Sequence, residues 1–162
     1  MKVQDAMMRT PAYCNPETNL GSAIELLWGR NCGILPIVDA KEKIIGVVTD
    51  RDLCVALGTR NRLAGQITVG EVATGEVHSC RGQDDIHTAL QTMANRRVRR
   101  LPVVSDDGVL EGILSMDNVV LHTESSGRGH KAELSDEDVV NTLRQIYGPQ
   151  VPQLMEARAA RA

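Results

Sequence analysis

The stretch GVVTDRDL, residues 46–53, returns 66 positions later as GILSMDNV, residues 112–119. In each copy an apolar run of strand length ends in a hydroxyl residue, Thr49 or Ser115, and a helix is expected to begin at once. A hydroxyl residue at a helix start leaves backbone N–H groups directed outward, where they readily accept an anion. The repeated stretch therefore predicts two equivalent strand–helix units, each with a candidate binding site at its junction.

The rest of the chain up to about residue 122 repeats at the same offset. Residues 3–8 correspond to 69–74, and polar capping residues predict helix starts near Thr18 and Asp84, followed by apolar positions at helical spacing. Each half therefore reads β-α-β-β-α. The predicted strands are 11–14, 34–38 and 44–48 in the first half and 77–80, 101–104 and 109–114 in the second, with closing helices that run to about Leu57 and Leu121.

These patterns predict an α/β (α+β) fold built from two repeats that are related by a pseudo-two-fold axis. A unit of about 60 residues buries only a modest core by itself. We therefore expect the two repeats to pack on each other and to share a cleft that carries both repeated stretches. We assign residues 1–62 to the first repeat, 67–122 to the second, 123–134 to a linker and 135–162 to a C-terminal helical extension.

The C-terminal extension has its own helix signals. Ser135 and the three acidic residues after it suit the first turn of a helix, and Gly148-Pro149 ends it. A helix this short gains its stability mainly by docking an apolar face, either on its own domain or on a second copy of the chain. The predicted apolar stripe consists of Val139, Val140, Leu143, Ile146 and Tyr147. Residues 154–162 are also helix-prone.

The composition argues against two classes of partner. Aromatic residues make up 2% of the 162 residues and Phe is absent, so the chain lacks the stacking platform of a single-stranded nucleic-acid binder. The formal net charge of −3 gives no general attraction to nucleic acid or to an anionic membrane. We therefore expect neither nucleic acid nor membrane as a partner.

The location is predicted to be cytoplasmic. No stretch approaches the roughly 18 apolar residues that a membrane span requires, and no apolar run follows the charged N-terminus as in a signal peptide. The four cysteines are widely spaced and form no C-x-x-C pair. Reduced thiols in the cytoplasm are the default for such a chain.

The repeated stretches, together with LPIVD at residues 35–39 and LPVV at residues 101–104, resemble cystathionine-β-synthase (CBS) domains. The resemblance covers residues 1–122 and implies a tandem CBS pair, or Bateman module, that assembles as a disc-shaped homodimer. It also implies a regulatory sensor that needs no cofactor and binds an adenosine-containing ligand of the AMP, ADP, ATP, S-adenosylmethionine or NAD(H) class between the repeats. A separate effector protein is a possible further partner.

The resemblance also implies two ligand pockets. In the first, Thr49 meets a phosphate, Asp52 binds the ribose hydroxyls and Val47 lies beside the adenine, while the other repeat completes the pocket with Val77, His78, Val98 and Arg99. The second pocket uses Ile113, Ser115 and Asn118, with Ala12, Ile34 and Arg100 facing it. Asn118 stands where the family pattern has an aspartate, so we expect the second pocket to bind less well.

A structural interpretation competes with ligand binding. Thr49 with Asp52, and Ser115 with Asn118, have the spacing of a capping box, which stabilises a helix start by about 1 kcal/mol. Two features favour a ligand: the stretch recurs beside a duplicated cleft, and arginines accompany it. Arg96 and Arg97 are typical of a solvated helix end, whereas Arg99 and Arg100 begin a strand and alternate in direction.

Two further functions are compatible with the sequence. Cys14 and Cys80 occupy equivalent positions and His78 lies on the same strand face as Cys80, so a metal or redox sensor is conceivable, although buried cysteines commonly pack as small hydrophobic groups. A structural or protein-interaction module without nucleotide is the other alternative. No nucleophile elbow, H-E-x-x-H or P-loop is present, so we expect no catalysis and no metal site.

Overall fold

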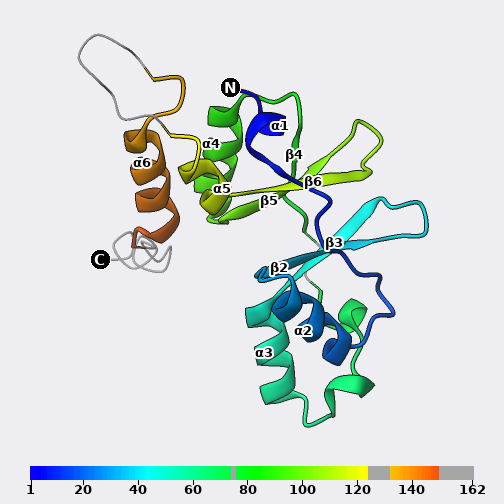
Figure 1. Ribbon diagram of the computed structural model, residues 1–162. Coiled ribbons are helices and arrows are strands. Elements are labelled where there is room, and N and C mark those ends of the chain that lie inside the picture. Colours follow the sequence, from blue (N-terminus) through cyan, green and yellow to red (C-terminus); the bar gives the residue numbers. More distant parts are fainter. Residues whose placement is uncertain (74–75, 124–131, 150–162) are drawn as a thin grey trace, which may run out of the picture.

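The two repeats form separate lobes in a computed structural model that describes residues 1–73, 76–123 and 132–149 (Figure 1). The predicted order β-α-β-β-α is confirmed, but the first strand of each repeat is shorter than expected: in the first repeat it is reduced to a bridge between Cys14 and Ile37, and in the second the strand predicted at 77–80 begins only at Cys80. The first repeat holds α2 (Leu20–Gly29), β2 (Ile34–Val38), β3 (Ile44–Thr49) and α3 (Asp50–Thr59); the second holds β4 (Cys80–Arg81), α4 (Ile86–Arg96), β5 (Arg100–Val104), β6 (Leu110–Ser115) and α5 (Met116–Val120).

The strand pairing places equivalent residues at equivalent points. β2 and β3 are antiparallel with Ile34 opposite Thr49, and β5 and β6 are antiparallel with Arg100 opposite Ser115. The second sheet has the order β1-β6-β5-β4, where β1 is Met8–Arg9. Strands β3 and β6 therefore end at equivalent points of their hairpins, at Thr49 and Ser115. A helix follows each strand without a loop.

The hairpins also join the two lobes. Lys43 bridges Val109, the Ile44 N–H donates to the Gly108 carbonyl over 3.1 Å, and the Leu110 N–H donates to the Glu42 carbonyl over 3.1 Å. Figure 1 shows the two hairpins extending on the same side of the molecule, with α2 and α3 at one end and α4 and α5 at the other. The helices therefore cover the outer ends while the strands meet in the middle.

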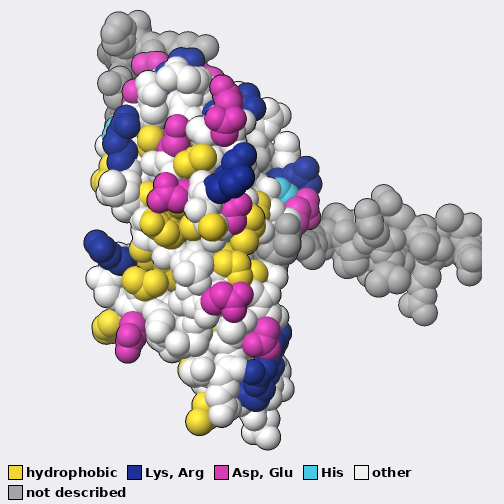
Figure 2. All heavy atoms as spheres, turned by 90° about the vertical axis from the view of Figure 1, so that its right-hand side faces the viewer, with side chains coloured by type: hydrophobic (Ala, Val, Ile, Leu, Met, Phe, Trp, Pro, Cys, Tyr) yellow, Lys and Arg dark blue, Asp and Glu magenta, His cyan; other side chains and the backbone are white. Residues whose placement is uncertain are grey.

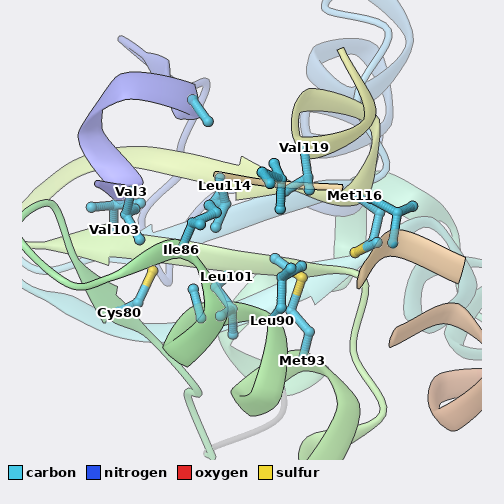
Figure 3. Close-up of a cluster of buried hydrophobic side chains, with 14 of the residues drawn as sticks. Val3, Cys80, Ile86, Leu90, Met93, Leu101, Val103, Leu114, Met116 and Val119 are labelled. Atoms are coloured by element: carbon cyan, nitrogen blue, oxygen red, sulfur yellow. The ribbon is translucent and has the colours of Figure 1, made fainter. Parts of the chain in front are cut away.

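The core is divided into two hydrophobic clusters, one for each repeat, and each cluster takes a segment from the other repeat's half of the chain. Helix α1 (Val3–Ala6) packs in the second cluster, where Val3 lies beside Val103 and near Cys80 (Figure 3). Ile67 and Val69, around the short helices η1 (Ala64–Gln66) and η2 (Val69–Glu71), are buried in the first cluster. Each repeat therefore needs the segment that precedes the other one.

Helix α6 (Asp136–Tyr147) docks on its own chain. It packs against α4 and α5 (Figure 1), and Val139 and Ile146 are buried in the second cluster together with Leu134. This decides between the two predicted docking partners. The predicted stripe is too wide, because Val140 and Tyr147 are 43% and 64% exposed.

Parts of the predicted C-terminal region fall outside the described residues. They are most of the linker, residues 124–131, and the helix-prone segment 154–162. Within the ranges that the structure covers, no helix is long and apolar enough to cross a membrane.

The docking of α6 predicts different effects for two adjacent substitutions. Val139→Ala should lower the free energy of unfolding by about 1–2 kcal/mol, because it removes buried methyl groups. Val140→Ala should change it by less than about 0.5 kcal/mol, because that side chain is half exposed. Urea denaturation of both variants measures the difference, and equal effects would contradict the docking of α6.

Candidate functional site

Each repeated stretch forms a capping box at the junction of strand and helix. The Thr49 N–H and hydroxyl both donate to Asp52 Oδ2, over 2.9 and 2.7 Å, and the Asp52 N–H reaches Thr49 Oγ1 over 3.4 Å. In the second repeat, the Ser115 N–H and hydroxyl donate to Asn118 Oδ1 over 3.2 and 2.6 Å. Both predicted capping boxes are therefore present.

A third box shows that this spacing is not specific to the repeats. At the start of α6, the Ser135 hydroxyl donates to Asp138 Oδ2 over 2.6 Å. This hydrogen bond is the largest of the effects that lower the pKa of Asp138. This helix lies outside the predicted pockets. A hydroxyl residue followed three positions later by a carboxylate or an amide therefore starts helices in this chain whether or not a pocket was predicted there, and ligand binding must be argued from the surroundings.

The surroundings of the first predicted pocket come partly from the second repeat. Val77, His78 and Val98 are partly buried, whereas Arg99 is exposed. Glu76 connects their two segments, because its Oε1 lies 3.8 Å from His78 Nε2 and 3.7 Å from Arg96. Within the described ranges, no ion pair or hydrogen bond joins these residues to the Thr49–Asp52 box. Glu76 was not singled out from the sequence, since an acid in a turn gives no distinguishing pattern.

On the first-repeat side of that pocket, Val47, Thr49 and Asp52 are all partly buried. Asp52 Oδ2 is taken up by the box, whereas Asp52 Oδ1 accepts no hydrogen bond from the residues that the structure describes. This oxygen is therefore free to accept from a ligand. The Thr49 hydroxyl has only one proton, and it is donated to Asp52.

Arg100 organises the second predicted pocket. It stands opposite Ser115 in the strand pairing, and its Nη2 lies 3.4 Å from Asp117 Oδ2. Its guanidinium also lies against the first repeat, because a Cβ added to Gly33 would be 3.3 Å from Nη1. The structure thus brings Arg100 and Ser115 close to the segment that holds Ile34.

The other second-pocket residues are more deeply placed. Ile34 and Ile113 are 7% and 4% exposed, Ser115 is 7% exposed, and Ala12 and Asn118 are partly buried. Two neighbours of Arg100 were not assigned to the pocket from the sequence. Asp117 lies at a position of the repeated stretch to which the family pattern assigns no ligand contact, and Gly33 carries no side chain to suggest a contact. Comparison of the two repeats could have drawn attention to Asp117, because it corresponds to Arg51 and has the opposite charge.

Two hollows lie elsewhere on the molecule. One of about 400 Å³ is lined by residues around Cys80 and Ser105. The other, of about 260 Å³, lies between the lobes and is lined by Thr10, Pro11, Tyr13, Val38, Glu42, Leu110 and Glu111. Figure 2 shows apolar side chains gathered in the middle of the molecule, where the two lobes meet. No predicted pocket residue lines either hollow, so both are separate from the predicted sites.

Comparison with solved structures supports the same architecture. The Vibrio cholerae protein AcuB has a TM-score of 0.68 and 31% identity, covering 75% of this chain and 88% of that one. CBSX2, solved in complex with AMP, has a TM-score of 0.65 and 29% identity, covering 74% of this chain and 93% of that one.

Sequence relatives include proteins of similar and of greater length. CBS domain-containing protein YhcV of Bacillus subtilis is 31% identical over 124 residues, which are 76% of this chain and 86% of YhcV. By contrast, the chain spans 40% of a 33.4 kDa protein of Thermofilum pendens that is 29% identical over 135 residues. It spans only 23% of an inosine-5'-monophosphate dehydrogenase of Methanocaldococcus jannaschii.

A family model for the CBS domain matches this chain twice, at residues 3–59 and 69–123. The two matches follow the duplication and the two lobes. The chain belongs to the CBS domain family and carries two copies of the domain.

Proposed function

We propose that this protein is a regulatory sensor that binds an adenosine-containing ligand between its two CBS repeats and catalyses no reaction. The observation that carries the proposal is the AMP complex of CBSX2, which this chain matches over 93% of that chain's length at 29% identity. A ligand held by residues of both lobes stabilises one relative arrangement of the lobes. It does so only to the extent that it binds that arrangement more tightly than the others. No cofactor is required for this role.

Asp52 is the residue that we assign to the ribose. A carboxylate repels a phosphate but accepts hydrogen bonds from hydroxyl groups, and charge-assisted bonds of this kind contribute about 1.5–3 kcal/mol each. Its Oδ1 atom is free within the described residues, while Oδ2 holds the helix start. Asp52 can therefore bind a ribose and keep its capping role at the same time.

The phosphate needs donors, and the Thr49 hydroxyl must turn to become one. Its proton is donated to Asp52 over 2.7 Å in the free protein. A phosphate in this pocket would accept the hydrogen bond of the Thr49 hydroxyl in place of Asp52, and it would be attracted by the exposed Arg99, whose side chain has no hydrogen-bond or ion-pair partner among the described residues. Val47, Val77, His78 and Val98 would enclose the adenine and the sugar.

The second pocket is proposed as the weaker site. Asn118 uses its Oδ1 in the capping box, so its amide NH₂ is the group left for a ribose. Ser115, Ile34 and Ile113 are buried, and Ala12 is partly buried, so little of this predicted site is accessible. Arg100 is already paired with Asp117.

A module that binds no nucleotide is the second candidate, and the capping boxes favour it. The third box, at Ser135 and Asp138, shows that this device starts a helix in this chain outside the predicted pockets. A thermal-shift panel of AMP, ADP, ATP, S-adenosylmethionine and NADH separates the two candidates, because a site filled at 100 times its Kd stabilises the protein by about 2.7 kcal/mol.

The metal or redox alternative finds no support in the geometry. Cys14 lies in the first hydrophobic cluster and Cys80 in the second, so the two thiols do not converge. Burial raises the pKa of Cys14 to about 11 and, with the nearby Asp84, that of Cys80 to about 12. Among the described residues, no group of three potential ligands is arranged to hold a metal ion.

A homodimer in the cytoplasm completes the proposal. Ile24 and Trp28 lie one turn apart on α2 and are 37% and 88% exposed. Their counterparts Leu90 and Ala94 are buried on α4, the helix that α6 packs against. An indole exposed to this extent suits burial against a second copy.

The cytoplasmic location is proposed from the cysteines. All four cysteines are free thiols, as in a reducing compartment.

Asp52→Asn tests the ribose assignment. Asn118 already forms the same box, so this variant should keep its stability within about 0.5 kcal/mol, whereas Asp52→Ala should lose about 1 kcal/mol with the cap. AMP affinity measured by calorimetry should fall at least about 10-fold in Asp52→Asn, because charge-assisted bonds to the sugar are lost. Unchanged affinity in this folded variant would contradict the site.

The cysteine environments predict unequal reactivity. At pH 8, a thiol with a pKa of about 11 is ionised to roughly one part in a thousand, so Cys14 and Cys80 should remain unmodified in the native protein. The exposed Cys54 should react with iodoacetamide at least about 100-fold faster. Peptide mass spectrometry measures each site, and rapid modification of native Cys80 would revive the redox alternative.

Trp28→Ser should convert a dimer of about twice 17.6 kDa into monomers. Light scattering after gel filtration measures the mass, and the emission of the single tryptophan should shift to longer wavelength as the wild-type dimer is diluted. Tyr147→Ser, which removes an exposed aromatic ring from α6, serves as the control. A wild-type monomer at high concentration would refute the proposed assembly.

A further inference from the structure

The helices of the two repeats present equivalent outer faces that are covered differently. On the first repeat, Ile24 of α2 is 37% exposed and Trp28 is 88% exposed, whereas their counterparts Leu90 and Ala94 on α4 are buried. The short helix η1, which follows the first repeat, packs on α2 but leaves Trp28 open. On the second repeat, α6 packs on both α4 and α5 (Figure 1).

Helix α6 is an addition to the two CBS domains. The second family match ends at residue 123, and α6 begins at Asp136. Its buried residues Val139 and Ile146 nevertheless share one hydrophobic cluster with Leu90 of α4 and Met116 of α5. We call the surface formed by Leu90, Ala94 and Met116 the α4–α5 face.

Polar contacts hold α6 to the second repeat at both of its ends. His87 Nε2 of α4 lies 3.5 Å from Asp138 Oδ2 in the first turn of α6, and Arg97 donates to the Gly148 carbonyl directly after α6. Gly21 and Asn31 take the places of His87 and Arg97 in the first repeat. The first repeat therefore lacks both contacts, and α6 is specific to the second.

The covered surface is apolar, and the surface that replaces it is mostly polar. Asp50, the counterpart of Met116, is exposed, whereas Met116 is buried. The outward side of α6 exposes Glu137, Asn141 and Arg144. Helix α6 therefore exchanges an apolar helix face for one that water solvates well.

We infer that α6 is a built-in cover that keeps a second pairing surface of this chain closed. When α6 leaves, the α4–α5 face binds the same face of a second copy, because a two-fold contact buries both apolar faces at once. Helix α4 carries ionisable groups only near its ends, at His87 and Arg96, so no charge opposes contact at its centre. This inference goes beyond the proposed function, because it involves neither the ligand nor the contact through Trp28.

The test uses the full chain with Trp28→Ser, which removes the proposed contact through the first repeat. Adding Val139→Asp and Ile146→Asp places two carboxylates in the second cluster, where an unpaired charge is not tolerated, so α6 should leave the face. Light scattering after gel filtration should then give a dimer of about twice 17.6 kDa.

The matched control adds Val140→Asp and Tyr147→Asp to the same Trp28→Ser protein. It brings the same charge to the same helix, each time one residue further along and at an exposed position. The control should remain monomeric. Hydrogen exchange of the amides of residues 136–147 should become at least about 10-fold faster in the released variant and stay unchanged in the control.

A further substitution locates the new contact. Ala94→Glu places a charge on the α4–α5 face and should return the released variant to a monomer. A monomer whose α6 exchanges freely, a dimer that survives Ala94→Glu, or aggregates without a defined mass would overturn the inference. Protection of α6 that persists in the released variant would contradict its docking and the inference with it. A monomeric wild type would refute only the contact through Trp28, since the pairing tested here uses the second repeat.

Discussion

Neither repeat of this protein can complete its own hydrophobic core, and that constraint determines the rest of the structure. Val3 is fully buried among residues of the second repeat, and Val69 is fully buried among residues of the first. Burying such a side chain contributes about 1.5–3 kcal/mol. The exchanged segments tie the two lobes together and hold the ends of β3 and β6, where both candidate pockets begin, in one relative arrangement.

The capping boxes show how one residue can serve structure and binding together. In each repeat a strand passes into a helix without a loop, so the hydroxyl residue must satisfy the first N–H groups of the helix. Asp52 does its part with one carboxylate oxygen and keeps the other free. Asn118 has only one oxygen, and the box uses it. The two copies are therefore equivalent as helix starts and unequal as acceptors.

Asymmetry also marks the outer surfaces of the two lobes. Helix α6 packs on the second repeat, where Leu90 and Ala94 are buried, whereas Ile24 and Trp28 remain exposed on the first. Arg97, directly after α4, donates to the Gly148 carbonyl just beyond α6, and His87 of α4 lies 3.5 Å from the Asp138 carboxylate at the start of α6. Both ends of α6 are thus held to the lobe that it covers.

The amino-acid sequence was sufficient to predict the duplication, the order of elements and the two helix starts, because these features depend on local periodicity and capping chemistry. It also led to the correct family through residues 35–53 and 101–119. Which core each N-terminal segment enters became clear only from the three-dimensional packing, because matching apolar patterns fit either lobe. The Arg100–Asp117 pair likewise needed it: the spacing of two residues along the chain does not reveal that their side chains meet, and Gly33, which makes room for the guanidinium, has no side chain to signal the contact.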